Sequence, residues 1–287
     1  MSAAFRLPII LVLFYLGFCH SLLSQNALED VQVEIYYIAD ADDATDRKGG
    51  RGLPEGAVTY RIYIDLADSC RLLSVYGNEN HGLRLATNTR FFSNTNRGGV
   101  SANDVSPDRL RENTVALDSW LSMGGASAMH LGVPKNQDND GNKIAGEMND
   151  RGSEKINGGL LKNTDPKAGV PLSQADGLKE GKPANIVFYG MDPYHFLQAS
   201  DTNVFESTNA AWATLGGTYG LPGTNKILIA QLTTDGGLDF QLNIQVARAD
   251  GKQEKYVSTP AVGEEIFSEK LRFRSKDFLE TTTKSTP

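Results

Sequence analysis

The stretch Val58–Leu66, VTYRIYIDL, decides the fold class, because apolar and polar side chains alternate along it. In a β-strand, side chains two residues apart point to the same side. One face would carry the apolar residues Val58, Tyr60, Ile62, Ile64 and Leu66. The other face would carry Thr59, Arg61, Tyr63 and Asp65. The pattern predicts a half-buried strand with its polar face toward water.

A second stretch with the same alternation covers residues 240–246, within DFQLNIQVAR. Its apolar side chains are Phe240, Leu242, Ile244 and Val246. The apolar segment KILIAQLTT precedes it, and the turn residues Asp235, Gly236 and Gly237 lie between the two. Asp-Gly is a common turn pair in β-hairpins, so the two segments are predicted to form a hairpin.

Further short strands are predicted along most of the chain. They begin at Val31, Arg71, Leu83, Val115, Asn185, Ala211, Glu254 and Leu271. A single helical turn is predicted after Ser106, which would be its N-cap, with Pro107 at the first helical position and Asp108 in the first turn. Many short strands with polar turns and almost no helical periodicity predict an all-β protein, an antiparallel β-sandwich of the jelly-roll-like kind.

The domain boundaries follow from changes in composition. Residues 1–24 have the form of a secretory signal peptide, because Arg6 precedes a short apolar run and small or polar residues follow. Cleavage near Ser24 would leave Gln25 first; lipidation of Cys19 is the alternative, which the bulky Phe18 disfavours. Residues 25–275 would form the sandwich, with a long loop insertion at about 124–183 rich in Gly, Asn, Asp, Lys and Pro, and residues 276–287 a flexible tail.

These features limit the cellular location that is expected for the protein and the partners that it is expected to bind. The exported chain would be periplasmic, attached to the cell surface or extracellular, and no second apolar segment is long enough to span a membrane. The formal net charge is −7, and loss of Arg6 makes it −8, which disfavours nucleic acid as a partner. Cys70 would be the only cysteine left, either a small half-buried residue or one half of an intermolecular disulfide.

Five segments taken together resemble a known module. They are YYIADADDATD, VTYRIYIDLADSCRLLSVYG, LDSWLSMGGAS, WATLGG and ILIAQLTTDGGLDFQLNIQV, and with them the resemblance covers nearly the whole mature chain. The set resembles a β-rich module of secreted Bacteroidetes-type proteins. Many members of that family carry a C-terminal sorting domain, which residues 271–287 do not contain. The resemblance implies export and a β-rich fold, and it supplies no catalytic residue.

The stretch KNQDNDGNKIAGE, from Lys135, has the spacing of a calcium-binding loop. An EF-type loop takes oxygen ligands from positions one, three, five, seven and twelve, with Gly at six. Those ligand positions hold Asn136, Asp138, Asp140, Asn142 and Glu147, with Gly141 at the turn. Asn136 stands where Asp is usual, Lys143 stands where an apolar residue is expected, and no helical pattern flanks the loop. We therefore expect mainly a surface turn, with any calcium binding weak.

A second acidic cluster follows the first predicted strand. Its carboxylates are Asp40, Asp42, Asp43 and Asp46. Such a cluster is repulsive unless a cation offsets it, and calcium is one candidate. Arg47, Lys48 and Arg51 follow at once and could offset the charge without a metal.

The sequence contains no motif for serine-hydrolase catalysis, phosphate binding or zinc binding. There is no Gly-x-Ser-x-Gly segment of a serine hydrolase and no glycine loop followed by Lys-Ser or Lys-Thr that would hold a phosphate. His81, His130 and His195 lie far apart and lack zinc spacing, so each is expected to be an isolated surface or half-buried residue. No catalytic residue and no cofactor other than calcium is predicted.

The leading functional hypothesis is an exported, non-enzymatic β-sandwich module with a binding or envelope role. Its partner would be a glycan or an envelope protein. One alternative is a carbohydrate-binding module, in which strand aromatics stack on sugar rings. The candidate aromatics are Tyr36, Tyr63, Trp120 and Trp212. A second alternative is a secreted hydrolase with two converging carboxylates in a cleft.

Overall fold

The fold was described from a computed structural model, which places residues 26–45, 53–112, 114–146, 161, 165–194, 197 and 203–278. Within these ranges the chain is nearly all β, and its sheets are antiparallel apart from one short parallel pair. The predicted fold class, an all-β sandwich, is confirmed. Residues 1–25 lie outside the described part, and so does the predicted signal peptide.

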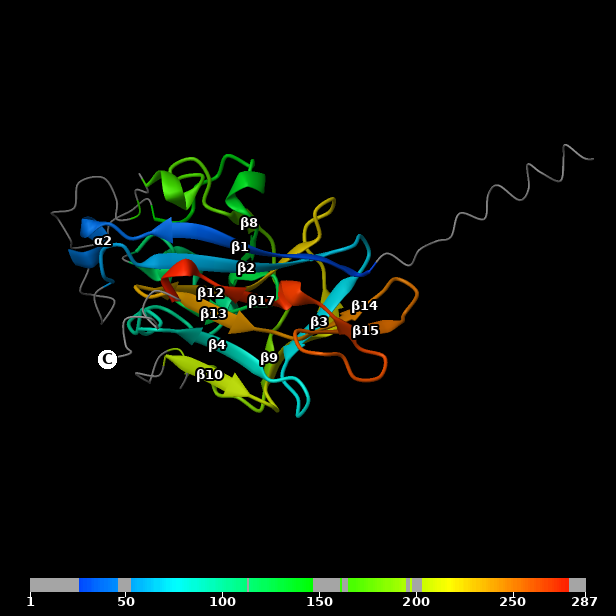
Figure 1. Cartoon of the computed structure of the whole chain (residues 1–287). Helices are drawn as coiled ribbons and strands as arrows, with labels where there is room; N and C mark the ends of the chain where they lie inside the picture. The colour runs from blue at the N-terminus through cyan, green and yellow to red at the C-terminus, as the bar shows by residue number, and fades with distance from the viewer. Residues whose placement is uncertain are drawn as a thin grey trace, which may run out of the picture.

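The central sheet contains the strand with which the sequence analysis began. Its order is β1 (Leu28–Ile38), β2 (Val58–Leu66), β12 (Lys226–Thr234) and β5 (Trp120–Leu121). Strand β2 has the predicted bounds and pairs with a long antiparallel neighbour on each side. Pairing on both edges places its backbone in the middle of the molecule (Figure 1).

Two further sheets face the central sheet from one side. The six-stranded sheet has the order β16 (Ile266–Phe267), β15 (Gln253–Val257), β14 (Ile244–Ala247), β3 (Arg71–Tyr76), β11 (Ala211–Thr218) and β9 (Val187–Tyr189). The β4 sheet has the order β10 (Val204–Ser207), β4 (Leu83–Thr87), β13 (Leu238–Gln241) and β17 (Arg272–Arg274). Their inner residues and those of the central sheet form one apolar core, which includes Ile62, Leu85, Trp212 and Ile244.

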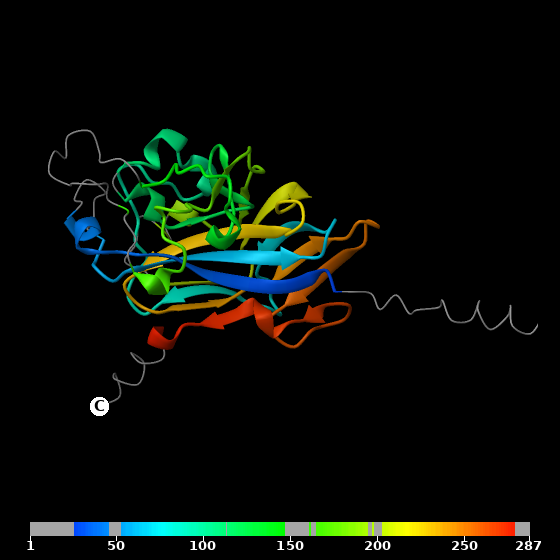
Figure 2. The same ribbon diagram turned by 90° about the horizontal axis from the view of Figure 1, so that it is seen from above.

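The other side of the central sheet is covered by the cover segment, which we define as the described residues of the range 92–178 apart from β5. Figure 2 shows this segment lying over β1, β2 and β12 as a third layer. A second apolar core fills the space between them and includes Tyr63, Trp120 and Leu228 of the sheet with Leu117 and Leu172 of the cover segment. The molecule is therefore a sandwich with an additional layer on one face.

The cover segment contains more strands and short helices than the sequence predicted. Its strands β6 (Gly125–Ser127) and β7 (His130–Gly132) form a small sheet with β8 (Leu178–Glu180). Its short 3₁₀ helices are η2 (Ala102–Asp104), η3 (Pro107–Arg109), η4 (Val115–Leu117), η5 (Lys135–Gln137) and η6 (Pro166–Ala168). The predicted irregular insertion at 124–183 thus contains strands too short to show a period in the sequence.

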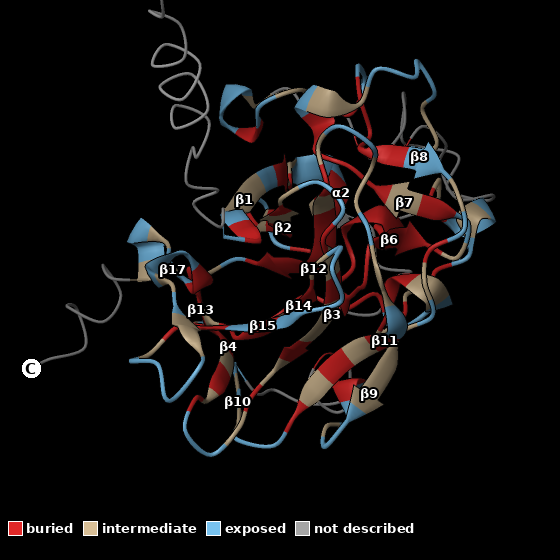
Figure 3. Cartoon of the chain, turned by 90° about the vertical axis from the view of Figure 1, so that its right-hand side faces the viewer, coloured by how far each residue is buried: buried red, intermediate tan, exposed pale blue. Residues whose placement is uncertain are grey.

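Burial corrects the prediction that β2 is half-buried. On its supposed solvent face Thr59, Arg61 and Tyr63 are as buried as the apolar residues of the other face, because the cover segment lies on them. Figure 3 shows β2 and β12 buried along most of their length. The alternation identified a strand correctly and its environment wrongly.

The predicted hairpin of residues 226–246 is also corrected. Strand β12 belongs to the central sheet, whereas β13 pairs with β4 and β17. The strand predicted at 240–246 is two strands, because the chain leaves β13 after Gln241 and enters the six-stranded sheet as β14 at Ile244. The alternation of apolar residues continues from β13 through this change of sheet into β14, because the apolar residues of both strands face the same core.

Smaller differences concern the short elements. The segment predicted as a strand from Val115 is the 3₁₀ helix η4 followed by the two-residue strand β5. The helical turn predicted after Ser106 is η3, with Pro107 at its start but no capping hydrogen bond from the Ser106 side chain. Helix α2 (Ala41–Thr45) and the 3₁₀ helix η8 (Glu269–Leu271) were not predicted. Among the described residues, no helix combines the length and apolar character needed to cross a membrane.

Candidate functional site

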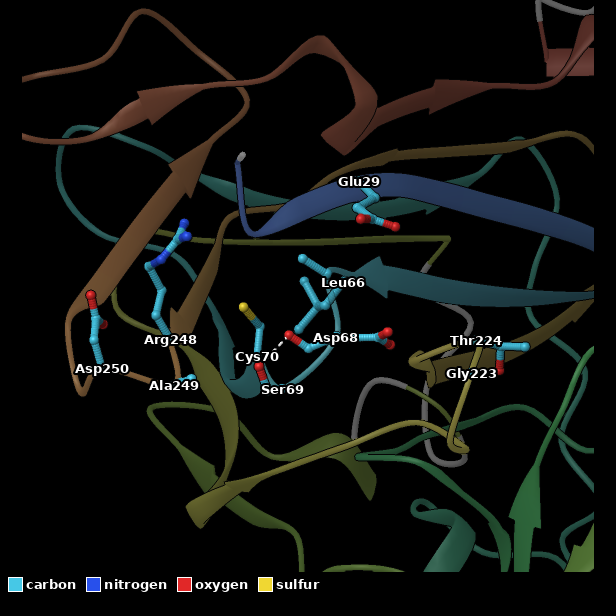
Figure 4. Close-up of a pocket in the computed structure, with 11 residues that line it drawn as sticks. Glu29, Leu66, Asp68, Ser69, Cys70, Gly223, Thr224, Arg248, Ala249 and Asp250 are labelled. Carbon is cyan, nitrogen blue, oxygen red and sulfur yellow. Dashed lines mark hydrogen bonds between the residues drawn. The ribbon is translucent and has the colours of Figure 1, made fainter. Parts of the chain in front are cut away.

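A cavity of about 600 Å³ lies at one end of the sandwich, where several strand turns meet. We call it the turn pocket. It is lined by Glu29, Leu66, Ala67, Asp68, Ser69, Cys70, Gly223, Thr224, Arg248, Ala249 and Asp250. These residues come from the start of β1, the β2–β3 turn, the loop before β12 and the β14–β15 turn. In the view of Figure 4, Arg248 and Asp250 lie at one end of the group and Gly223 and Thr224 at the other.

Two residues with unusual backbone conformations shape the pocket. Ser69 has φ of 65° and Asn225 has φ of 36°, and in the described part of the chain they are the only residues other than glycine with positive φ. Ser69 lines the pocket and Asn225 directly follows Thr224. A left-handed conformation costs most residues with a side chain, such as Ser69, about 1 kcal/mol or more, whereas asparagine adopts it more readily. Such strain is concentrated at binding and catalytic sites.

The buried Asn225 side chain fixes the two turns to each other. Its Nδ2 donates to the backbone oxygens of Ala67 at 2.8 Å and Cys70 at 3.0 Å. Its Oδ1 accepts a hydrogen bond from the backbone N–H of Gly220 at 2.8 Å. One side chain thus joins the β2–β3 turn to the loop before β12, and the pocket wall is held in place without a ligand.

The pocket is acidic. Three carboxylates line it, from Glu29, Asp68 and Asp250, against one guanidinium, from Arg248. The Arg248 Nη1 donates to Glu254 Oε1 at 3.1 Å, so its charge is already offset by a carboxylate outside the pocket lining. Glu254 Oε2 in turn accepts a hydrogen bond from Tyr256 Oη at 2.6 Å. The lining therefore presents negative charge to anything that enters.

Cys70 contributes a neutral wall to the pocket. Its side chain is buried rather than half-buried, and it forms no disulfide. Burial raises the pKa of the Cys70 thiol, and a thiol with a raised pKa is a poor nucleophile at neutral pH. An intermolecular disulfide through Cys70 stays a prediction, and it would need this sulfur to reach the surface.

No family model, curated protein or solved structure matches this chain. The resemblance to the secreted Bacteroidetes-type module therefore stays a prediction.

The predicted calcium loop is partly used for internal hydrogen bonds. Asp138 Oδ2 accepts hydrogen bonds from the backbone N–H groups of Asp176 at 3.1 Å and Gly177 at 2.8 Å. Asp140 Oδ1 accepts one from the backbone N–H of Asn142 at 2.8 Å, as in an Asx turn. Burial raises the pKa of Asp138. These bonds are those of a structural turn that is held against the residues just before β8.

The remaining positions of that loop are placed as follows. Asn136 lies in the 3₁₀ helix η5, and Gly141 has φ of 77°, the left-handed turn that the sequence predicted for a glycine. Glu147, the predicted ligand at position twelve, lies outside the described residues.

The second acidic cluster begins helix α2. Asp40 Oδ1 accepts hydrogen bonds from the backbone N–H groups of Asp42 and Asp43, and Asp43 Oδ2 accepts one from that of Asp40. This reciprocal pattern is a capping box. Asp46 lies outside the described residues. Within the described ranges, no three side chains of His, Cys, Asp or Glu are grouped so that they could hold a metal ion, and calcium binding stays a prediction.

The histidines differ from the prediction of isolated, partly exposed residues. His81 is buried, with Nδ1 at 2.5 Å from Thr259 Oγ1 and Nε2 at 2.5 Å from Glu265 Oε2. His130 is also buried, its Nδ1 lies 2.7 Å from Ser127 Oγ, and burial lowers its pKa. His195 lies outside the described residues. Both described histidines join neighbouring segments of the fold.

The aromatic residues proposed for sugar stacking lie inside the molecule. Tyr36, Tyr63, Trp120 and Trp212 are each at most 1% exposed. Trp212 belongs to the core between the sheets, and the other three belong to the core beneath the cover segment. None of them can form a stacking platform, so the carbohydrate hypothesis loses the observation that suggested it.

Sequence reasoning did not identify the residues of the turn pocket. The segments ADSC and ARADGK, which contain Asp68 and Asp250, have the composition of turns, and this was the only signal they carried. These turns meet at one end of the sandwich because of the order of the strands in the sheets. That order cannot be read from the sequence.

Proposed function

We propose that this protein is an exported, non-enzymatic β-sandwich module that binds a small, polar, positively charged ligand in the turn pocket. The observation that carries the proposal is the pocket wall itself. Its two strained positions, Ser69 and Asn225, are held by the hydrogen bonds of Asn225 before any ligand arrives. A pre-formed wall saves the entropy that a loop would lose on binding.

Size and charge indicate the class of ligand. A cavity of about 600 Å³ lies within the range of small-molecule sites in proteins, roughly 300 to 1,000 Å³. The carboxylates of Asp68 and Asp250 are exposed at the pocket, and the net charge of the whole chain, −7, attracts cations toward it. We infer a ligand that carries an ammonium or guanidinium group on a polar body.

Export and an envelope role are part of the same proposal. Their support is the signal-peptide pattern of residues 1–24 and the resemblance of the mature chain to a secreted module. An envelope glycan with a free amino group would fit the charge of the pocket. The hydrolase alternative would require two of the three carboxylates of the turn pocket to converge on one bond of a substrate. In the described part of the chain the neighbouring carboxylates of Asp138 and Asp176 are both engaged with backbone N–H groups.

Three sugars of similar shape and different charge test the proposal. Binding of glucosamine, N-acetylglucosamine and glucuronate is measured near pH 6.5 by two-dimensional NMR of the exported chain. Glucosamine is expected to shift the amide resonances of Asp68, Ser69 and Asp250, and the neutral and anionic sugars are expected to bind at least about tenfold more weakly.

Variants locate the site. Asp68→Asn combined with Asp250→Asn keeps the volume of the lining and removes two charges, so the affinity for glucosamine should fall about tenfold or more. Asp108→Asn is the control, because Asp108 is an exposed aspartate outside the pocket. Equal binding of all three sugars, or unchanged affinity in the double variant, would contradict the proposal.

A further inference from the structure

The outer face of the β4 sheet carries an unusual row of cationic side chains. The strand register places Arg84 of β4 opposite Gln241 of β13, and Gln241 opposite Arg272 of β17. The next outward position of β13 is Asp239, which lies opposite Arg274. The residues between them, including Phe240 and Phe273, belong to the core face, where these two rings stack with centroids 5.4 Å apart.

These outward residues line a second cavity. It measures about 380 Å³, and besides the outward residues Arg84, Asp239, Gln241, Arg272 and Arg274 its lining includes Phe240 and Phe273 between them. We call it the arginine groove. Arg84 and Arg272 are two strands apart, about 10 Å at the backbone, so their long side chains can reach one small group above Gln241. The groove is thus open to solvent and bordered by guanidinium groups.

The charges of the groove do not balance. Asp239 accepts hydrogen bonds from Arg84 Nη1 and from Arg274 Nε, the latter at 2.7 Å. Arg84 Nε also donates to Glu206 Oε1 of the neighbouring strand β10 at 2.6 Å. The carboxylates of Asp239 and Glu206 therefore pair with two of the three arginines, Arg84 and Arg274. The Arg272 side chain is exposed, and within the described ranges it makes neither a hydrogen bond nor an ion pair, so one positive charge is left over.

An aromatic ring restricts two of the guanidinium groups. The Phe278 ring centroid lies 5.3 Å from Arg274 Cζ and 6.0 Å from Arg84 Cζ, within the range of cation–π contacts. Together with the bonds to Asp239, this contact limits the positions that the two side chains can adopt. Pre-positioned guanidinium groups bind planar or tetrahedral oxyanions with paired hydrogen bonds.

We propose that the arginine groove binds the carboxylate or sulfate group of an acidic ligand, with Arg272 and Arg274 as its principal partners. The Nε2 of Gln241 donates to the Gly82 oxygen at 2.9 Å, and its second N–H would be a neutral donor to the ligand. The site is independent of the turn pocket, which is acidic and lies on other segments. A local cationic groove on a chain of net charge −7 permits anion binding at one place while the rest of the surface repels anions.

The test uses two probes that separate the sources of such a group. Inorganic sulfate represents a free small anion, and tetragalacturonate represents a polymer that carries carboxylates. Affinities are measured by calorimetry at low salt with the whole chain. Saturable binding of either probe supports the site, and the tighter probe identifies the source. If neither binds at millimolar concentration, the proposal is wrong.

Three variants assign the binding to the groove. Arg272→Gln should weaken binding about tenfold without loss of folding, because the Arg272 side chain has no partner in the described structure. Asp239→Asn should strengthen binding about threefold or more, because the internal competitor for Arg84 and Arg274 loses its charge. Arg90→Gln, at an exposed arginine outside the groove, should change nothing. Wild-type affinity in Arg272→Gln would overturn the assignment.

Discussion

Asp43 and Asp118 are buried carboxyl groups, and burial raises the pKa of each to about 7. Their hydrogen bonds differ. Asp118 accepts backbone N–H groups at both oxygens, from Asn94 at 2.7 Å and Gly99 at 2.8 Å. The chain passes so close that a Cβ at Gly98 would lie 2.0 Å from Asp118 Oδ2, which explains the glycine. Asp43 uses Oδ2 in the capping box, while its Oδ1 is buried without a hydrogen bond.

Asp43→Asn should change how stability depends on pH. Because the folded pKa of Asp43, about 7, exceeds the ordinary 3.8, the folded chain holds a proton that the unfolded chain releases. The free energy of unfolding therefore falls as the pH rises from about 4 to about 7. Asparagine keeps the bond to Asp40 and removes the charge, so the variant should be more stable than the wild type at pH 8 by on the order of 2 kcal/mol.

Urea denaturation at pH 4 and at pH 8 measures this difference. The two proteins should be similar at pH 4, where the wild-type carboxyl group is protonated as well. Asp108→Asn, at an exposed aspartate, is the matched control and should follow the wild type at both values. An Asp43→Asn variant that is less stable at pH 8 than at pH 4 by as much as the wild type would contradict the assignment.

At the scale of elements, the corner between β13 and β14 connects two sheets. Asn243 lies in it and is fully buried. Its Nδ2 donates to the backbone oxygens of Tyr76 and His81, each at 3.0 Å, and its Oδ1 accepts from the backbone N–H of Ser258 at 3.1 Å. These partners lie before β4 and after β15 in the sequence. A single amide thus replaces the ladder hydrogen bonds that are lost where the chain changes sheets.

Asn243→Ala should lower the free energy of unfolding by on the order of 3 kcal/mol, because it removes the hydrogen bonds that its buried side chain makes to the backbone at Tyr76, His81 and Ser258. Gln245→Ala is the matched control two residues further on. Gln245 Nε2 donates to Gln253 Oε1 near the surface, so its loss should cost about 0.5 kcal/mol or less. Urea denaturation of both variants provides the measurement, and equal effects would show that the corner does not depend on Asn243.

At the scale of the whole molecule, a buried polar network attaches the cover segment to the central sheet. Arg61 of β2 donates from Nε to Gln231 Oε1 and from Nη1 to the backbone oxygen of Gly177, each at 2.9 Å. Its Cζ lies 3.5 Å from the centroid of the Tyr36 ring. Lys135, also buried, donates to the backbone oxygens of Tyr36 and Ala168, and burial lowers its pKa to about 8.

Arg61→Met should loosen the cover segment while the core between the sheets stays folded. The variant leaves Gln231 Oε1 without its donor, removes one of the two hydrogen bonds that the Gly177 oxygen accepts, and removes the cation beside Glu34. We expect a loss of on the order of 3 kcal/mol. Hydrogen exchange should accelerate first at the Val133 amide, which donates to Gly177, and remain slow in β14.

Arg71→Met is the control for this change. Arg71 Nη1 donates to the Gly216 oxygen at 2.7 Å in an exposed position, so its removal should leave the exchange of Val133 unchanged. Uniform acceleration across all sheets in Arg61→Met would mean that the cover segment and the sandwich unfold as one unit.

Most of the long strands could be predicted from the sequence, and the sites could not. Period-two alternation is a local property, and β2 and β4 begin where it begins. The turn pocket depends on Asn225 meeting Cys70, which is 155 positions away. The arginine groove depends on the register of β4, β13 and β17. Neither a contact between residues far apart in the sequence nor the register of paired strands produces a periodic pattern in the sequence.

The sequence by itself determined that the protein is built from β-strands, and which side chains of each strand share a face, because strand geometry depends on neighbouring residues alone. Only the tertiary structure decided what lies against each face. Arg61 sits on what the alternation marks as a solvent face, yet it is buried because Gly177, 116 positions later, lies on it. Burial depends on contacts between distant segments. A polar residue in a strand can therefore either face water or belong to a buried hydrogen-bond network.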